Sequence, residues 1–392
     1  MTNEESKAIF DIDLASKWIQ AVWIGVENND VLFYIARSGT FDENNTLLKL
    51  GRVRLQFSPD PFSDGKFLQE LDIQKGSVKI RGINDNIDLD IQFWVDVFKP
   101  VVHIEVSGTE GFETKLTYEN WRYKDRLLRK NESFGNSYKW APPQDLKTPK
   151  DEISFLNSDI LFYHRNKADS TIFDVTVKQQ GMDSVKAQMF NPLQNLTFGG
   201  LIRADEMQPG GNSYGRYQNA DFQAWILKST EPVKKQVIEI FLHTDQPENI
   251  ESWQNDLNKI VSGYKNESSA RERTEQWWSE FWQRSFIVID GDNADKNSVD
   301  WQIGRNYQLF RYMLGCNAHG TYPTKFNGGL FTYDPCFVDS NRCFTPDFRN
   351  WGGGTFTAQN QRLVYFPMLK NGDFDMMRSQ FHFYMRILKN AE

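Results

Sequence analysis

The sequence predicts a multidomain β + α protein, in which a large antiparallel β-sandwich is followed by helices. Three observations support this. Segments with period-2 alternation follow one another without intervening helices as far as about residue 246. The hydrophobic period then becomes helical, and helical periodicity continues to residue 392. We therefore expect a β-sandwich domain at 1–246, a helical linker with a short strand at 247–297, and a helical domain beginning at 298–392.

The strand segments of the first part place apolar side chains on alternate positions. The early ones are "SVKIRG" (77–82), "IDLDIQFWVDV" (87–97) and "VVHIEVSG" (101–108). The later ones are "STIFDVTVKQQ" (170–180), "LTFGGLIRAD" (196–205), "DFQAWILKS" (221–229) and "KQVIEIFLHTD" (235–245). Turn clusters such as "SPDPFSDG" (58–65) and "QPGGNSYG" (208–215) separate them. Many strands without crossover helices favour antiparallel sheets.

The linker is predicted to contain two helices and one strand. In "ENIESWQNDLNKIVSGY" (248–264) the apolar residues recur at helical spacing. The next helix, in "SSARERTEQWWSEFWQRSF" (268–286), starts with Ser268 or Ser269 as a cap. Its broad aromatic stripe is predicted to be core and consists of Trp277, Trp278, Phe281 and Trp282. "FIVIDG" (286–291) is predicted to form the short strand.

The last part has three helical patterns, "VDWQIGRNYQLFRYMLGCNA" (299–318), "AQNQRLVYFPMLKN" (358–371) and "DFDMMRSQFHFYMRILKN" (373–390). Pro367 is expected to cut or kink the second of them. Their apolar faces exceed what these helices can bury against one another and the sandwich. We therefore expect them to belong to a helical domain that continues beyond Glu392.

Composition excludes several classes of partner. The net charge of −7 provides no basic stripe for nucleic acid. No apolar run reaches about 18 residues, so no membrane span is expected. The N-terminus lacks the pattern of a signal peptide. No metal or nucleotide motif is present, and we expect neither a metal nor a cofactor. The three cysteines give no disulfide framework or zinc spacing, and a Cys336–Cys343 bridge is left open.

Aromatic residues make up 14% of the chain, with 12 Trp and 30 Phe. Aromatic side chains fill protein cores, and they also stack on the apolar faces of sugar rings. The stretch "YPTKFNGGLFTYDPC" (322–336) combines both features, since it mixes four aromatics with Lys325, Asn327 and two glycines. It is predicted to be a loop that is either tightly packed or in contact with a ligand.

The C-terminal motifs "WWSEFWQRSFI", "GRNYQLFRYMLGCNAHGTYPTKFNGGLFT" and "RNWGGGTFTAQNQRLVYFPMLKNGDFDMM" carry a resemblance. They resemble bacterial glycoside hydrolases related to family 95, of the alpha-L-fucosidase and alpha-L-galactosidase type, with an uncharacterised subgroup seen in Bacteroidetes. The resemblance implies an N-terminal β super-sandwich, a linker and an (α/α)6 barrel that holds the active site. It also implies an enzyme located in the periplasm or outside the cell, with a carbohydrate substrate.

The resemblance further implies inverting hydrolysis, in which one carboxylic acid protonates the leaving oxygen while an activated water attacks the opposite face. In family 95, asparagines on a helix start hold this water. "AQNQRLVYFP" is the matching stretch, and Asn360 stands for the second asparagine. Ala358, Arg362 and Val364 replace other amide positions, so Gln361, or Gln359, is expected to substitute. The catalytic carboxylates lie beyond Glu392, so residues 1–392 alone are expected to be inactive.

The substrate-binding residues expected at the barrel mouth are Lys325, Asn327, Phe331, Arg349 and Trp351. Lys325, Asn327 and Arg349 would bind hydroxyl groups, and Phe331 and Trp351 would stack on the sugar. The alternative is a tightly packed loop whose aromatics are core. The carboxylates near these loops are Asp334, Asp339, Asp347, Asp373 and Asp375, and Asp373 is expected to be a helix N-cap.

The function predicted from the sequence is therefore a glycoside hydrolase acting on glycans, without a metal and without contact to nucleic acid. The alternative is a non-catalytic carbohydrate-binding or structural β-sandwich protein, which the altered amide pattern and the missing carboxylates favour for these 392 residues. The sugar, the linkage and the oligomeric state are left open.

Overall fold

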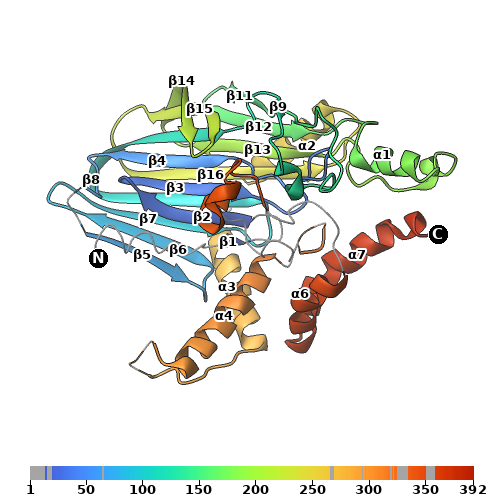
Figure 1. Ribbon diagram of the computed structural model, residues 1–392. Helices are drawn as coiled ribbons and strands as arrows, with labels where there is room; N and C mark the ends of the chain where they lie inside the picture. Colours follow the sequence, from blue (N-terminus) through green and yellow to red (C-terminus); the bar gives the residue numbers. More distant parts are fainter. Residues whose placement is uncertain are drawn as a thin grey trace.

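The structure of the protein is a computed structural model. It describes residues 14–15, 20–63, 66–264, 269–293, 295, 297–317, 320, 322–324, 334–349 and 358–392. Within these ranges a large antiparallel β-sheet domain is followed by several helices (Figure 1).

Fourteen strands among the described residues form one hydrogen-bonded network with two halves, which share β8 (Val101–Asn120). The first half has the order β1-β2-β3-β4-β8-β15-β14. Its other strands are β1 (Leu14–Ala15), β2 (Gln20–Glu27), β3 (Asp30–Ala36), β4 (Arg52–Ser58), β14 (Met207–Tyr217) and β15 (Ala220–Ser229). The second half has the order β5-β6-β7-β8-β16-β13-β12-β11. Its other strands are β5 (Lys66–Asp72), β6 (Ser77–Ile83), β7 (Asp88–Val95), β11 (Glu152–Leu156), β12 (Asp159–Arg165), β13 (Thr197–Ala204) and β16 (Val233–Asp245).

The long strand β8 joins the two halves because its two ends pair with different neighbours. Its first part, from Val101 to Gly108, pairs with β7 and β16. Its last part, from Glu113 to Asn120, pairs with β4 and β15. The residues that follow β8 therefore leave the first half of the sheet between β4 and β15.

The two halves face each other across one core. Alternate residues of β3 and β4, such as Phe33 and Leu55, share this core with alternate residues of β6 and β7, such as Ile80 and Phe93. The rings of Phe33 and Phe93 meet edge to face with centroids 5.4 Å apart. Two alternating strands from each side and a shared apolar interior define a sandwich. The structure thus has the large antiparallel β-sheet domain that the alternation predicts, and its two facing halves are called the sandwich below.

Two predictions within the sandwich region are wrong. Residues 170–180 were expected to be a strand, but they contain helix α1 (Ile172–Gln179), because Thr171 and Asp174 form a capping box at its start. Residues 208–215 were expected to be a turn cluster, but they lie inside β14, which pairs with β15 across an irregularity between Pro209 and Asn212. In both places, local hydrogen bonding outweighs the composition of the segment.

Smaller elements lie in the connections of this region. β9 (Arg126–Leu127) and β10 (Lys147–Thr148) pair as a separate two-stranded sheet. The short 3-10 helices η2 (Glu132–Gly135) and η3 (Lys186–Gln188) follow β9 and α1. β9, β10 and η2 belong to a long excursion that leaves the end of β8 and returns at β11.

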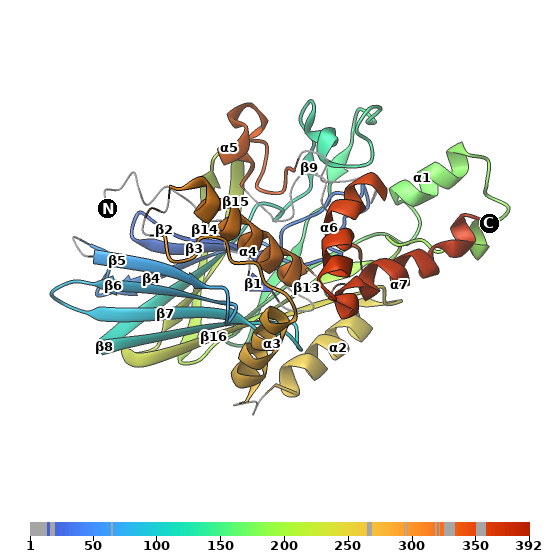
Figure 2. The ribbon, with the colours of Figure 1, turned by 90° about the horizontal axis from the view of Figure 1, so that it is seen from below.

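Helix α2 (Ile250–Ser262) covers the outer face of the second half of the sheet (Figure 2). Its Asn249 caps the N-terminus by accepting a hydrogen bond from the backbone N–H of Ser252 at 2.9 Å. Trp253, Leu257 and Val261 are buried against β13 and β16 residues such as Leu201 and Phe241. The apolar residues that recur at helical spacing in the sequence therefore form the buried face of α2.

Helices α3 (Ala270–Arg284) and α4 (Val299–Asn317) form the next layer, with the predicted aromatic stripe in its core. Trp278 is fully buried and lies over Gly76, where even a Cβ atom would fall 2.0 Å from the indole Nε1. Gly76 also has a positive φ of 64°, so this turn requires glycine. The predicted short strand at 286–291 is wrong, because Phe286, Ile287 and Val288 are exposed and pair with no sheet.

The remaining helices are α5 (Pro335–Val338), α6 (Ala358–Lys370) and α7 (Arg378–Arg386), with 3-10 turns η4 (Ser340–Arg342), η5 (Phe374–Met377) and η6 (Leu388–Asn390). Pro367 does not cut α6, which continues to Lys370 although the proline nitrogen donates no hydrogen bond to the preceding turn. Asp373 was expected to cap a helix, but its side chain makes no cap and pairs with buried Arg311 at 2.5 Å.

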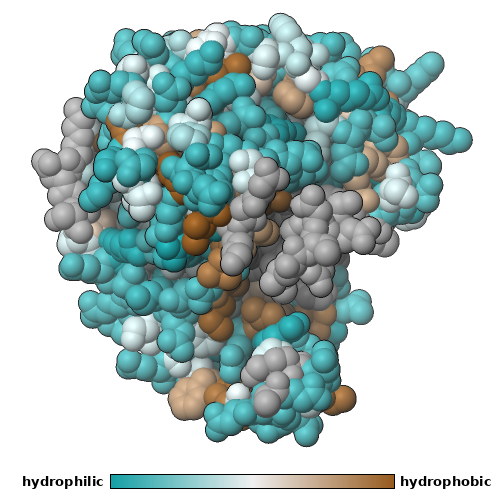
Figure 3. All heavy atoms as spheres, turned by 90° about the vertical axis from the view of Figure 1, so that its left-hand side faces the viewer, coloured by the Kyte–Doolittle hydropathy of each residue, from teal (hydrophilic) through white to brown (hydrophobic). Residues whose placement is uncertain are grey.

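Most side chains on the face drawn in Figure 3 are hydrophilic, and apolar ones gather in a band across its middle. No helix in the described part of the chain is long and apolar enough to cross a membrane.

Candidate functional site

The predicted site residues fall into two groups. Lys325, Asn327, Phe331 and Trp351 lie outside the described residues. The described ones are Asn360 and Gln361, in the first turn of α6, and Arg349, a buried residue at the end of the 334–349 segment.

Gln361 has a defined orientation. Its side chain is only 3% exposed, and its amide Nε2 donates a hydrogen bond of 2.9 Å to the backbone oxygen of Thr324. Its carbonyl oxygen Oε1 is also buried and has no hydrogen-bond partner among the described residues. A buried acceptor without a partner is unfavourable by about 1–3 kcal/mol, so a water or hydroxyl donor at this oxygen would be stabilising.

The contact of Gln361 fixes the start of the predicted sugar-binding loop. Thr324 directly precedes Lys325 and also donates its backbone N–H to the Tyr365 hydroxyl at 2.9 Å. Its own hydroxyl donates to the backbone oxygen of Asn317 at 2.9 Å. Burial raises the pKa of Tyr365, which therefore stays neutral. Helices α4 and α6 are thus tied together at the point from which the loop leaves.

The other end of this loop is tied to the sandwich through Asp334. Its carboxylate accepts hydrogen bonds from the hydroxyl groups of Tyr34 at 2.9 Å and Tyr217 at 2.5 Å. It also caps α5 by accepting from the backbone N–H of Cys336 at 3.0 Å. Asp334 is therefore fully engaged in structure.

A disulfide between Cys336 and Cys343, left open by the sequence, closes the turn that follows. It links α5 to the residue after η4, so Arg342 lies within a cross-linked loop. Cys316 is buried in the α3–α4 core and takes no part in the bond.

Asp347 connects the same segment to a buried ionic network. Its carboxylate accepts from the Trp121 indole at 2.5 Å and from Arg122 Nη1 at 2.6 Å. Arg122 also pairs with Asp151 at 2.7 Å, and Asp151 meets His164 Nδ1 at 2.9 Å. Burial disfavours the charge of Arg122, but the two carboxylates outweigh it and raise its pKa. For Asp151, burial is likewise outweighed, and Arg122 and His164 lower its pKa to about 2.

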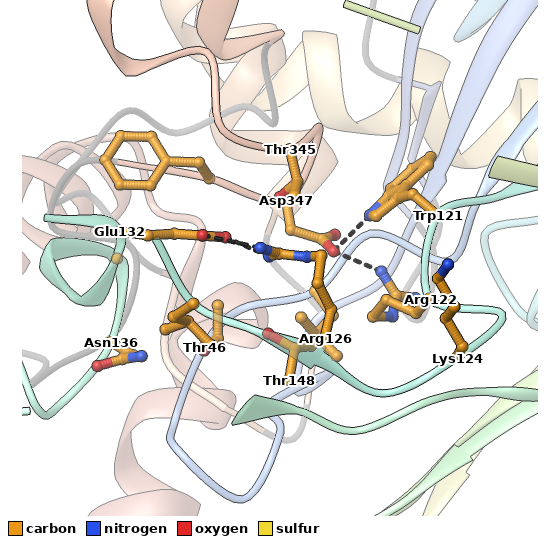
Figure 4. A pocket seen from close by; sticks show the side chains of 14 residues that line it. Thr46, Trp121, Arg122, Lys124, Arg126, Glu132, Asn136, Thr148, Thr345 and Asp347 are labelled. Carbon is orange, nitrogen blue, oxygen red and sulfur yellow. Dashed lines mark hydrogen bonds and ion pairs between the residues drawn. The ribbon is translucent and has the colours of Figure 1, made fainter. Parts of the chain in front are cut away.

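This network forms one side of a small hollow of about 20 Å³, shown in Figure 4. Arg126 crosses it and pairs with Glu132, and Trp121 and Lys124 lie beside Arg122 and Asp347. Its volume holds about one water molecule. The remaining lining residues are Thr46, Leu48, Leu128, Gly135, Asn136, Thr148, Thr345 and Phe348.

The sequence did not predict that these residues form a network. Its partners lie far apart along the chain, with Arg122 and Asp347 separated by 225 residues. The only signal was the density of cations in "WRYKDRLLRK" (121–130), directly after a long strand.

One group of described residues has the donor types of a cation site. The ligand atoms of His243, Asp245 and Asp256 lie within 4.8 Å of one another. Burial lowers the pKa of His243 to about 4, so the imidazole is neutral. Lys259 already pairs with Asp256 at 2.7 Å and would compete with a cation.

Comparisons with known proteins give one family and two structural similarities. The sequence model of DUF5703_N, described as "Domain of unknown function (DUF5703)", matches residues 19–287. A putative kojibiose phosphorylase from the human microbiome is similar at 12% identity and a TM-score of 0.44, over 84% of this chain and 42% of that one. A bacterial glucoamylase complexed with acarbose is similar at 11% identity and a TM-score of 0.44, over 94% and 48%. The chain spans less than half the length of these two proteins, and no residue role is transferred from them. No curated protein matches the sequence.

Proposed function

The chain belongs to the DUF5703_N family, a domain of unknown function, and we propose that it forms part of an inverting glycoside hydrolase related to family 95. The observation that carries the proposal is Gln361, in the helix start that resembles the water-holding motif. Its amide is fixed, and its carbonyl oxygen has no hydrogen-bond partner in the described part of the chain. Neither the sugar nor the linkage is assigned.

In this proposal, Gln361 Oε1 accepts a hydrogen bond from the attacking water and orients its lone pair toward the anomeric carbon. A neutral amide positions water but does not take its proton, so a carboxylate must receive it. A carboxylic acid gives its proton to the leaving oxygen as the glycosidic bond breaks. Asn360 lies one residue away in the same turn and is proposed to share the positioning of water or substrate.

The loop between Thr324 and Asp334 is proposed to line the sugar subsite, with Lys325, Asn327 and Phe331 as contacts, and Arg349 and Trp351 from the following loop. Support comes from its two anchored ends, Thr324 on α4 and α6 and Asp334 on the sandwich. An anchored loop can hold its contacts in place for binding. A periplasmic or extracellular location is also proposed, supported by the Cys336–Cys343 disulfide, which persists in oxidising compartments.

A second candidate is a non-catalytic carbohydrate-binding protein. The state of the nearby carboxylates favours this candidate. Asp334, Asp347 and Asp373 are all buried, and each forms hydrogen bonds or ion pairs that hold the structure together. None of these three is available as a general acid.

The two candidates are separated by assaying the full-length protein on aryl alpha-L-fucosides, aryl alpha-L-galactosides and a panel of oligosaccharides, with proton NMR of the first product anomer. The proposed hydrolase releases sugar with inverted configuration. Binding without turnover would establish the second candidate instead. Retention of configuration, or no glycan bound or cleaved, would contradict the proposed mechanism.

A further inference from the structure

Trp140 is an unusual feature of the sandwich surface, since its side chain is 81% exposed. It lies in the excursion between β8 and β11, and its ring centroid is 5.7 Å from that of Phe134. Two prolines, Pro142 and Pro143, follow closely and restrict the backbone behind it. A large exposed indole held beside a second ring, tilted to it by 59°, is an apolar platform, and such platforms mark binding surfaces.

Cations surround this platform. Lys139 Nζ lies 4.8 Å from the Trp140 ring centroid and 5.8 Å from that of Phe134. The Arg342 guanidinium lies 5.9 Å from the Phe134 ring centroid and comes from the disulfide-linked loop. The pKa of Lys139 is lowered, first by desolvation and then by the positive charge of Arg342. Arg342 also pairs with Asp339 at 3.3 Å in an exposed contact, so an anion bound between Lys139 and Arg342 would relieve their repulsion in competition with this carboxylate.

The local charge is opposite to that of the whole chain. Residues 122–150 contain eight Lys or Arg against three Asp or Glu, in a protein of net charge −7. Arg122 and Arg126 are neutralised by Asp151, Asp347 and Glu132. Lys124 and Lys130 are exposed and form no ion pair within the described residues. Lys124 and Lys130 therefore place positive charge at the surface of the same excursion.

The same excursion contains a buried hydrogen-bond donor two residues from Phe134. Asn136, which lines the hollow, is 2% exposed, and its Nδ2 has no hydrogen-bond partner among the described residues. Its Oδ1 accepts from the backbone N–H of Tyr138 at 2.9 Å, which fixes which end of the amide carries the donors. An unpartnered buried amide favours a ligand or water that brings an acceptor oxygen.

An ion pair and hydrogen bonds also fix the conformation of the excursion in the absence of a ligand. Glu132 pairs with Arg126 and accepts from the backbone N–H of Arg129 at 2.9 Å. The backbone N–H of Ser137 donates to Asn44 O at 3.1 Å. A preformed surface loses little conformational entropy on binding.

We propose that Phe134, Lys139, Trp140 and Arg342 form a binding site for an anionic glycan on the sandwich. A sugar ring would stack on Trp140, while Lys139 and Arg342 would bind its carboxylate or sulfate group. The site rests on the proposed function for its choice of a sugar as ligand. A nucleic acid fits less well, because the basic surface is a small patch in an acidic protein.

The test is isothermal titration of the full-length protein with galacturonate oligomers, sulfated glycosaminoglycan fragments and uncharged oligosaccharides of equal length. We expect binding of one anionic class, weakened by salt, and at least about tenfold weaker for Trp140→Ala, the size of a stacking hot spot. Lys139→Gln and Arg342→Gln should each weaken binding and reduce its salt dependence. Which class binds identifies carboxylate or sulfate as the recognised group.

The matched controls are Phe286→Ala, another exposed aromatic, and Lys235→Gln, an exposed lysine outside the excursion, and both should bind as the parent does. Equal binding of uncharged sugars, binding unaffected by Trp140→Ala, or preferential binding of oligonucleotides or anionic lipid vesicles would each overturn the site. Glycan binding at Trp140 without hydrolysis would contradict only the proposed enzyme. Hydrolysis that depends on Gln361, without binding at Trp140, would contradict only this site.

Discussion

Two regions pack against the sandwich in opposite ways. The α3–α4–α6 layer does so through aromatic and aliphatic side chains, centred on Trp278, Phe281 and Tyr312. The 334–349 segment does so through buried polar groups, centred on Asp334 and Asp347. The contact of the α3–α4–α6 layer has a broad apolar area, and it tolerates small shifts of the helices on the sandwich. The second has fixed partners and distances, so it defines where the candidate sugar loop ends.

The position of the 334–349 segment is fixed by directional polar contacts. Apolar packing is non-directional, whereas the Arg122 guanidinium meets Asp151 and Asp347 in set directions. A buried ion pair adds little net free energy to folding, because its burial costs desolvation energy. Removal of one partner is nevertheless strongly destabilising, because the other is left as an uncompensated buried charge. The two regions should therefore respond differently to substitution and to pH.

The largest effect is expected for Arg122→Ala. It leaves Asp151 and Asp347 as buried carboxylates without their cation, and the free energy of unfolding should fall by about 5 kcal/mol. Denaturant unfolding measures this loss. The control is Arg216→Ala, which breaks an exposed pair with Asp221 and should lose less than about 1 kcal/mol. Equal losses in the two variants would show that the network does not hold the segment.

A slightly smaller loss is expected for Trp278→Ala in the apolar layer. The cavity and the lost burial should reduce the free energy of unfolding by about 4 kcal/mol, as for other buried tryptophans. Trp140→Ala is the matched control, because its exposed ring should change stability by less than about 0.5 kcal/mol. A loss at Trp278 as small as that at Trp140 would contradict the packing of α3 on Gly76.

Acid should act on the polar region through Asp151. The pKa of Asp151 is about 2 in the folded protein, below its ordinary value of about 3.9, so the unfolded chain takes up the proton first as pH falls. Its contribution is therefore complete above about pH 4 and is lost as pH falls toward 2, by about 2 kcal/mol.

Asp151→Asn should flatten the dependence of unfolding free energy on pH between 4 and 2. Thermal or denaturant unfolding across this range measures the slope. Asp221→Asn, at an exposed aspartate, should keep the parent slope. An unchanged slope in Asp151→Asn would mean that the acid sensitivity arises elsewhere.

The contrast between the regions also explains what the sequence could predict. Apolar period identified the sandwich, α2 and the Trp277–Trp282 stripe, because burial imposes a repeat on neighbouring residues. It failed at 170–180, where a capping box turns a β-branched run into a helix. It failed at 286–291, where an apolar run has no strand to pair with.

Polar contacts across long separations leave no such repeat. Asp334 and Asp347 were recognised only as carboxylates near loops, and their partners Tyr34, Tyr217 and Arg122 were not identified. Gln361 was named from a motif resemblance, but its fixed amide and unpartnered oxygen required the structure. Nothing in the sequence indicated that Trp140 is exposed, since a single tryptophan in a loop is equally compatible with a buried and an exposed side chain.

The most direct test of the central claim is the kcat of Gln361→Ala in the full-length protein on its best glycoside substrate. If Gln361 orients the attacking water, kcat should fall by about 100-fold with little change in KM. The control Gln276→Ala, at an exposed glutamine of α3, should keep the parent kcat. A parent-like kcat for Gln361→Ala would contradict the proposed role of this residue and, with it, the proposed mechanism.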